Sequence, residues 1–154
     1  MKLHHIGFVV SSIQESAESF TIPLAAAWDG NAVFDPIQRV RVAFFRGLNR
    51  EDPQIELIEP GAPDSPVSNF LKRGGGLHHL CYEVDDLDSY LQQCPAIGTT
   101  VIRRPAPAAA FDGRRIAWGI TRKRLLLEFL EARGSGSSVN PEVQVNYPCP
   151  KTVL

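Results

Sequence analysis

The sequence predicts an α+β fold of two tandem βαβββ modules, and three recurrences along the chain predict it. Two apolar strands carry histidines 74 residues apart (79 minus 5), at His5 and His79. Each strand is followed, at the same offset, by a helix N-cap and a buried helical stripe. Two later strands with a carboxylate in the middle recur with an offset of 72, which is 128 minus 56. Such agreement in register indicates a duplicated unit.

The first module begins with a strand over His5–Val10, which is rich in apolar and β-branched residues. Ser12 is a typical N-cap for the helix that follows. The buried stripe of this helix consists of Ile13, Ala17 and Phe20. We expect Pro23 and the turn Trp28–Asn31 to separate the helix from the strands beyond. Those strands are predicted over Val40–Phe45 and Gln54–Glu59.

The second module repeats this order. The glycine run Gly74–Gly76 lets the chain turn sharply before the strand that contains His78 and His79. Asp86 takes the N-cap place, and the buried stripe becomes Leu87, Leu91 and Cys94. The last two strands are predicted over Arg115–Ile120 and Leu125–Glu131. The change of offset from 74 to 72 indicates that about two residues were lost in the loops.

The chain of 154 residues fits one domain, which we place at residues 1–133. Its modules cover residues of about 3–60 and 77–132, and the linker 61–76 contains a short helix over Val67–Lys72. Residues 134–154 form a Gly/Ser/Pro-containing tail that reads as flexible. We expect its alternating Val143, Val145 and Tyr147 to pack along this or a neighbouring subunit.

Composition excludes several classes of partner. The net charge of −1 gives no electrostatic case for nucleic acid, and no apolar run reaches the roughly 20 residues of a membrane span. The N-terminus lacks the apolar region of a secretory signal. The three cysteines are odd in number and lack metal-type spacing, which favours reduced thiols and a cytoplasmic protein.

The candidate site follows from strand alternation, because successive side chains point to opposite faces. Glu128 is predicted to share its face with leucines, whereas Glu131 points the other way; the same alternation separates Glu56 from Glu59. A carboxylate among leucines is costly to bury unless it is paired or binds a cation.

If the modules pair about a pseudo-twofold axis, two imidazoles and two carboxylates converge in one cleft. Nitrogen and oxygen ligands of this kind suit a divalent transition ion with open positions for substrate. His4 and His78 are predicted to lie on the opposite face. The predicted metal ligands are therefore His5, Glu56, His79 and Glu128.

Each of these residues also has an ordinary structural interpretation. A histidine at the start of a strand is often a polar end, and a glutamate in an apolar strand often faces solvent. The repeat favours the metal site because it links four residues at matching places.

The doubled pattern with these four residues resembles the vicinal oxygen chelate superfamily, which includes glyoxalase I, extradiol dioxygenases and antibiotic-resistance proteins. Asp64–Lys72 followed by Gly75–Asp86 is similar to the methylmalonyl-CoA epimerases of that superfamily. The resemblance covers roughly Leu3 to Ala132. It implies a glyoxalase-like fold, in which the two modules form a cupped mixed β-sheet around a metal site.

The resemblance also implies a chemistry. The four matching positions would bind a divalent ion such as zinc, cobalt, nickel or manganese, which stabilises an enolate when an α-proton leaves a small acyl substrate. Glu128 matches the ligand that also acts as the catalytic base. By analogy with the family we expect a homodimer. The composition gives no case for nucleic acid or membrane as a partner. The phosphates of a thioester substrate would find partners among Arg103, Arg104, Arg114, Arg115 and Arg122–Arg124; a solvated basic rim is the alternative.

The chain departs from the epimerase pattern in two places. Some epimerases supply a second carboxylate from the strand written here as Arg39–Phe44, which contains no acid. The His-Pro pair that often precedes the last strand is replaced by Gly119–Arg124. The predicted function is therefore a metal-dependent isomerase or epimerase of a small acyl compound, possible substrates being methylmalonyl-CoA and related acyl-CoA esters.

Three alternatives share the fold. A glyoxalase I-like lactoylglutathione lyase would use the same four ligands. An extradiol dioxygenase uses two histidines and one carboxylate, so Glu56 would be a surplus ligand. A non-catalytic protein that binds a small molecule such as an antibiotic would lack the ligand set.

Overall fold

The computed structural model describes residues 1–134, and the predicted tail packing through Val143, Val145 and Tyr147 lies outside the described residues. The N-terminal half contains β1 (Lys2–Val9), α1 (Ile13–Leu24), β2 (Val33–Asp35), β3 (Val40–Phe45), β4 (Gln54–Pro60) and α2 (Ser68–Lys72). The C-terminal half contains β5 (Gly76–Val84), α3 (Leu87–Gln93), β6 (Thr99–Pro107), a 3-10 turn η1 (Ala109–Phe111), β7 (Arg115–Thr121) and β8 (Leu126–Glu131). The predicted α+β order of two βαβββ modules is confirmed.

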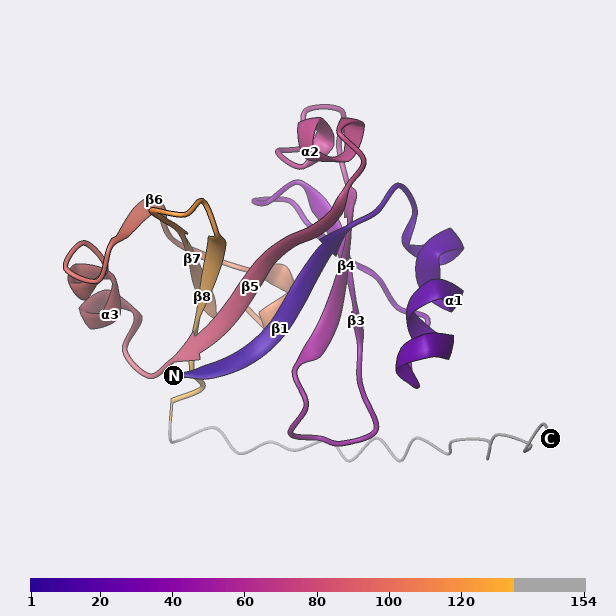
Figure 1. Cartoon of the computed structure of the whole chain (residues 1–154), viewed down its shortest axis with the longest axis horizontal. Coiled ribbons are helices and arrows are strands. Elements are labelled where there is room, and N and C mark those ends of the chain that lie inside the picture. The colour runs from indigo at the N-terminus through magenta and orange to yellow at the C-terminus, as the bar shows by residue number, and fades with distance from the viewer. Residues whose placement is uncertain (135–154) are drawn as a thin grey trace.

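All eight strands form one mixed sheet in the order β2-β3-β4-β1-β5-β8-β7-β6. Figure 1 shows β1 and β5 side by side in the middle, with α1 and α3 at opposite ends of the curled sheet. The two modules thus meet through their first strands, which pair antiparallel about Ile6 and Leu80. The sheet has the cupped, glyoxalase-like architecture that the resemblance implied.

The register between β1 and β5 is that of a twofold pseudosymmetric pair. His5 lies opposite Cys81, and Gly7 lies opposite His79. Adding 74 to the first number of either pair, and subtracting 74 from the second, gives the other pair. The predicted repeat is therefore a symmetry of the sheet as well as of the sequence.

Two of the helices, α1 and α3, cover the outer face of the sheet, and each begins where its cap predicts. Ser12 accepts a hydrogen bond from the backbone N–H of Glu15 at 3.3 Å, and Asp86 accepts one from the N–H of Ser89 at 3.0 Å. The expectation that Pro23 lies beyond the first helix was wrong. Pro23 lies inside the last turn of α1, which ends one residue later at Leu24.

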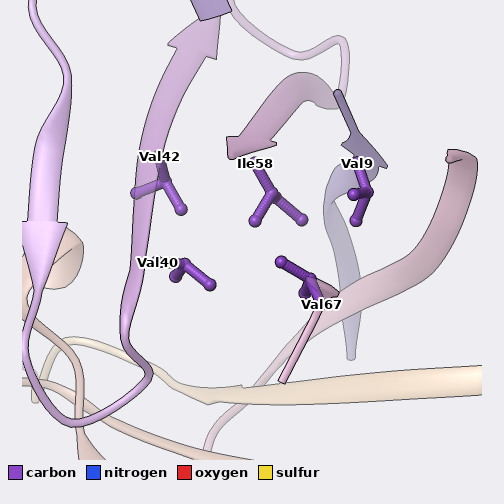
Figure 2. Close-up of a cluster of buried hydrophobic side chains, with 5 residues drawn as sticks. All are labelled: Val9, Val40, Val42, Ile58 and Val67. Carbon is purple, nitrogen blue, oxygen red and sulfur yellow. The ribbon is translucent and has the colours of Figure 1, made fainter. Parts of the chain in front are cut away.

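Two outer clusters bury the helices against the sheet, and two inner clusters line the cup. The outer side chains of the first module include Ile13, Ala17, Ala43, Phe45 and Leu57. Its inner cluster consists of Val9, Val40, Val42, Ile58 and Val67, all of which are buried. Figure 2 shows that these five side chains point toward one another from β1, β3, β4 and the residue before α2. The alternation of strands therefore separates a structural face from a face that is free to line a site.

The glycine run before β5 does what the sequence predicts. Gly74, Gly75 and Gly76 all have positive φ, with values of 111°, 66° and 89°. A Cβ atom on Gly75 would lie 2.5 Å from the carbonyl oxygen of Val9. Glycine here lets the chain turn sharply into β5 directly beside the end of β1. Among residues 1–134, no helix is both long and apolar enough to span a bilayer.

Candidate metal centre

Two rows of residues across the centre of the sheet bring the four predicted ligands together. In one row Cys81 lies between His5 on β1 and Glu128 on β8. In the other row Gly7 lies between His79 on β5 and Glu56 on β4. Each row therefore combines a histidine of one module with a glutamate of the other.

The tips of these four side chains converge in the buried interior. His5 Nε2 lies 3.1 Å from His79 Nε2. Glu128 Oε2 lies 3.0 Å from His5 Nε2 and 3.5 Å from His79 Nε2. Glu56 Oε2 lies 3.4 Å from each of the two nitrogens. All four residues are at most 5% exposed.

The donor set fits a divalent ion. Ligand atoms about 2.1 Å from a zinc ion lie about 3.4 Å apart in a tetrahedron, close to the separations found here. The ligand atoms of His5, His79 and Glu128 all lie within 4.8 Å of one another, so these three residues could hold an ion. Glu128 Oε2 is buried without a well-aligned hydrogen-bond donor among the described residues, despite the nearby imidazoles. A cation would satisfy that orphaned oxygen.

The protonation states in the ion-free cluster follow from burial and charge. Burial alone would lower the pKa of His5, but the Glu56 and Glu128 carboxylates outweigh it and raise the pKa to about 9. Burial would likewise raise the pKa of Glu128, yet the neighbouring His5 and His79 hold it well below its usual range. An imidazolium beside ionised carboxylates occupies the place that a metal cation would take.

His4 and His78 lie beside the cluster, and the prediction that they point to the opposite face was wrong. The β1–β5 ladder is interrupted between Leu3 and His5 and again between Gly7 and Phe8. The first irregularity leaves His4 as an extra residue on β1, and the second leaves His78 as an extra residue on β5. A bulge of this kind redirects a side chain, so simple alternation fails there.

Each extra histidine reaches the ring of its neighbour. His4 Nδ1 lies 2.9 Å from His5 Nδ1, and His78 Nδ1 lies 3.0 Å from His79 Nδ1. Burial, followed by the charge of the neighbouring histidine, lowers the pKa of both His4 and His78 to about 4. Both rings are therefore neutral at pH 7.

Gly7 and Cys81 occupy equivalent places in the two rows but differ in size. A Cβ atom on Gly7 would lie 2.2 Å from Cε1 of His79, so the ring occupies the space that a side chain would need. Cys81 is fully buried, and burial, together with Glu128, raises the pKa of its thiol well above the usual value. Its sulfur lies within 4.8 Å of ligand atoms of His4 and His5.

A cavity of about 290 Å³ opens next to the cluster. Glu56, His79 and Glu128 lie in its wall. The rest of the wall is mostly apolar and includes Val40, Val42, Ile58, Val67, Phe111, Ile116, Trp118 and Leu126. An apolar cavity with a few convergent polar groups is typical of a small-molecule site.

The two modules are tied together at the rim of this cavity. Arg103 of β6 donates to Gln38 Oε1 at 2.7 Å, and the backbone N–H of Ala109 donates to Asp35 Oδ2 at 2.9 Å. Asp35 Oδ1 also accepts from the N–H groups of Ile37 and Gln38. Asp35 is therefore a structural carboxylate, although it lines the cavity.

The arginines expected to meet substrate phosphates lie in three different surroundings. Arg114 is paired with Glu83 at 2.7 Å, and Arg115 is paired with Glu131 and Asp88. Arg103 lines the cavity, whereas Arg122 and Lys123 line a separate shallow depression with Gly98. The expectation is thus weakened for Arg114 and Arg115, which already have carboxylate partners.

Sequence reasoning missed Asp35, Gln38 and the orientation of His4 and His78, the outer histidines of the two His-His pairs. Asp35 and Gln38 lie in and after a three-residue strand whose position the repeat did not indicate. The available signal was the His-His doublet, which recurs at both repeated places. Strand alternation directs only one histidine of each doublet into the cluster, so the recurrence of the other one was unexplained.

Comparison with known proteins gives a consistent result. The profile of the Glyoxalase/Bleomycin resistance protein/Dioxygenase superfamily matches residues 4–118. Mitochondrial methylmalonyl-CoA epimerase of Dictyostelium discoideum is 31% identical over 122 residues, which cover 76% of this chain and 69% of that protein. The uncharacterised protein YqjC of Bacillus subtilis is 34% identical over 136 residues, covering 86% of this chain and 94% of YqjC.

Solved structures share the fold. A variant of Streptomyces coelicolor methylmalonyl-CoA epimerase in complex with 2-nitronate-propionyl-CoA superposes with a TM-score of 0.72. It is 21% identical in sequence, and the match covers 87% of this chain and 99% of that one.

Proposed function

The chain belongs to the Glyoxalase/Bleomycin resistance protein/Dioxygenase superfamily, and on that premise we propose that it is a metal-dependent isomerase or epimerase. Its substrate in this proposal is a small acyl-CoA ester, of which methylmalonyl-CoA is the first candidate. The reaction begins when the enzyme removes an α-proton. Sequence similarity to methylmalonyl-CoA epimerases supports the substrate class, and the Streptomyces relative binds an acyl-CoA analogue.

The observation that carries this proposal is the position of the cluster in the cavity wall. Three members of the cluster line the cavity, where a bound ligand would contact them: Glu56, His79 and Glu128. His5 completes the cluster through its contact with Glu128. We propose all four as metal ligands, with zinc, cobalt, nickel or manganese as the ion. A divalent ion held there would act as a Lewis acid on the negative charge that develops as the α-proton leaves.

Glu128 is the proposed base. It is ionised in the ion-free cluster, as a proton acceptor must be, and it lies in the cavity wall. Its buried position beside an apolar cavity keeps water away from the reacting carbon. Trp118 and Phe111 line the cavity. In this proposal they pack against the acyl group, which would fix the α-carbon relative to the carboxylate.

Glu56 is the proposed second acid–base group for inversion of a stereocentre. The strand Val40–Phe45 contains no acid, as the sequence indicated. Among residues 1–134 three acids line the cavity, and one of them, Asp35, is engaged by backbone N–H groups. Glu56 is thus the remaining carboxylate apart from Glu128.

Three organisational proposals accompany the function. Residues 1–133 act as one domain, because each module supplies half of the cluster. The chain works as a homodimer, by analogy with its superfamily. It resides in the cytoplasm, which the buried free thiols of Cys81 and Cys94 support.

The test is α-proton exchange in heavy water, with metal-loaded protein and a panel of acyl-CoA esters that includes methylmalonyl-CoA. We expect incorporation of deuterium at the α-carbon of at least one ester, and exchange about 10²–10⁴-fold slower in Glu128→Gln, the usual contribution of a general base. Glu131→Gln is the matched control, because Glu131 lies on the same strand but pairs with Arg115 on the outer face. It should exchange as the wild type does.

Two outcomes would contradict the proposal in different ways. No deuterium incorporation in any ester, together with conversion of a glutathione hemithioacetal, would point to the lactoylglutathione lyase. Tight capture of a small molecule by metal-free protein, without turnover, would point to a binding protein.

A further inference from the structure

Each proposed imidazole ligand has its own imidazole partner, and the two pairs are related by the pseudo-twofold axis. Nδ1 faces Nδ1 at 2.9 Å in the pair His4 and His5, and at 3.0 Å in the pair His78 and His79. Both separations are those of a hydrogen bond between nitrogens. A matching bulge in each strand produces both contacts. Because the same backbone irregularity produces this contact in both strands, the contact is part of how the site is built.

When both rings of a pair are neutral, as metal binding requires, one proton lies between the two Nδ1 atoms. Its location decides what the inner ring, that of His5 or His79, can bind beside the outer ring of His4 or His78. A neutral imidazole carries one N–H and one lone pair. If the inner ring donates through Nδ1, its Nε2 is free to bind a cation. If the outer ring donates instead, the inner ring carries its proton on Nε2, and the metal position is blocked. Ligand histidines in metal sites commonly donate their second N–H to a fixed acceptor.

The outer rings are themselves held in place by aromatic side chains. The ring of His4 meets Phe111 edge to face, with centroids 5.5 Å apart. The ring of His78 meets Phe70 in the same manner at 4.9 Å, and Trp118 lies at 6.1 Å. These contacts restrain each outer ring beside its partner.

We propose that His4 and His78 are positioning residues, each of which accepts the Nδ1–H of the adjacent ligand histidine and thereby keeps its Nε2 lone pair directed at the ion. The inference depends on the proposed metal site, because the direction of the hydrogen bond is set by the need for a free Nε2. It assigns a role to the first member of each His-His doublet.

The test compares cobalt(II) affinity, measured by absorption titration, across paired variants. His4→Leu and His78→Leu remove the acceptor, and each should bind cobalt about 10–100-fold more weakly, as expected for loss of a group that orients a ligand. His4→Asn and His78→Asn retain an oxygen acceptor and should recover most of that affinity. Melting of the ion-free proteins shows whether each variant is folded. Leucine variants that fold and bind cobalt as tightly as the wild type would overturn the inference.

A second readout locates the protons in zinc-loaded protein, in which both ligand rings are neutral. Long-range proton–nitrogen correlation spectra of the full chain should show protonated Nδ1 in His5 and His79, and unprotonated Nδ1 in His4 and His78. The reverse assignment would overturn the inference. Wild-type protein that binds no cobalt would remove the proposed metal site, whereas a normal titration with reversed protons would remove only the role of the outer histidines.

Discussion

The N-terminal and C-terminal modules place the same two kinds of side chain in the cluster but support them differently. In one row, the imidazole of His79 lies over Gly7, which leaves no room for even a methyl group. In the equivalent row, the imidazole of His5 lies beside Cys81, which packs with Phe111 and Leu130 in the inner core. The ligands of the two modules are related by the symmetry of the sheet, and the residues between them are not.

The surrounding elements differ in the same way. The second strand has three residues in the first module and nine in the second. The first helix spans 12 residues and its counterpart α3 spans seven. The duplicated positions are thus those near β1 and β5, where both modules build the cluster. The two modules are thus most alike where both supply side chains to the cluster, and they differ most in their second strands and helices.

The largest difference between the two rows is expected when a side chain is added at Gly7, where there is no room for one. Gly7→Ala forces a methyl group into the space of the His79 ring, so the ring must move out of reach of the ion. We expect cobalt binding at least about 100-fold weaker, more than an orienting group alone is worth. Cys81→Ala, at the equivalent place, should keep its cobalt affinity. Equal affinities for the two variants would contradict the asymmetry.

The next effect concerns the carboxylate of the first module. Glu56→Gln keeps an oxygen ligand but loses its charge, and Glu56 Oε2 lies no closer than 3.4 Å to either imidazole nitrogen. We expect cobalt binding weakened by about tenfold, near the low end for perturbed sites. Racemisation of methylmalonyl-CoA should fall further than α-proton exchange if Glu56 serves the second face. Glu59→Gln, on the outer face of β4, is the control.

Each module contains one outer histidine, so we expect both modules to contribute to the dependence of stability on pH in the same way. The pKa values of these histidines, about 4 in the folded protein, lie below 6.5, the ordinary value, so only the unfolded chain takes up protons between these limits. The stability that they contribute is present above pH 6.5 and is lost as the pH falls toward 4. We expect the melting temperature of ion-free protein to drop over this range.

The double variant His4→Asn and His78→Asn provides the control for this pH response. Because asparagine does not titrate, the fall in melting temperature between pH 6.5 and pH 4 should be shallower. A fall as steep as in the wild type would assign the response to other groups.

The smallest expected effects are at the helix caps. Asp86 accepts from both the N–H and the hydroxyl of Ser89, at 3.0 and 2.7 Å, whereas Ser12 accepts one longer bond. Loss of an N-cap costs about 1 kcal/mol, or about 2–4 °C in a chain of this size. Asp86→Ala should therefore lower the melting temperature more than Ser12→Ala does. The reverse order would show that cap geometry does not explain the difference.

The repeat made most of the fold predictable from the sequence. Offsets of 74 and 72 located six strands and both main helices, because periodicity and capping are local properties of the chain. The second strand of each module was not located, since β2 is three residues long and β6 is irregular in its pairing. Pro23 was misplaced because a proline in a last helical turn removes only one hydrogen bond.

The convergence of the four candidate ligands was predictable because strand alternation holds for Glu56 and Glu128. It was not predictable that His4 and His78 would join them. A bulge depends on the register between β1 and β5, which are 74 residues apart, and no local pattern reveals that register. The cavity rim at Asp35, Gln38 and Arg103 likewise depends on contacts between modules.

The central claim is that one ion is shared by side chains from both modules. Anomalous diffraction at the cobalt edge, from crystals of protein loaded with one equivalent of cobalt(II), tests it most directly. The account predicts a single peak within about 2.0–2.2 Å of His5 Nε2, His79 Nε2 and a Glu128 carboxylate oxygen, with Glu56 as the fourth protein ligand. A peak elsewhere, or one that contacts residues of only one module, would contradict it.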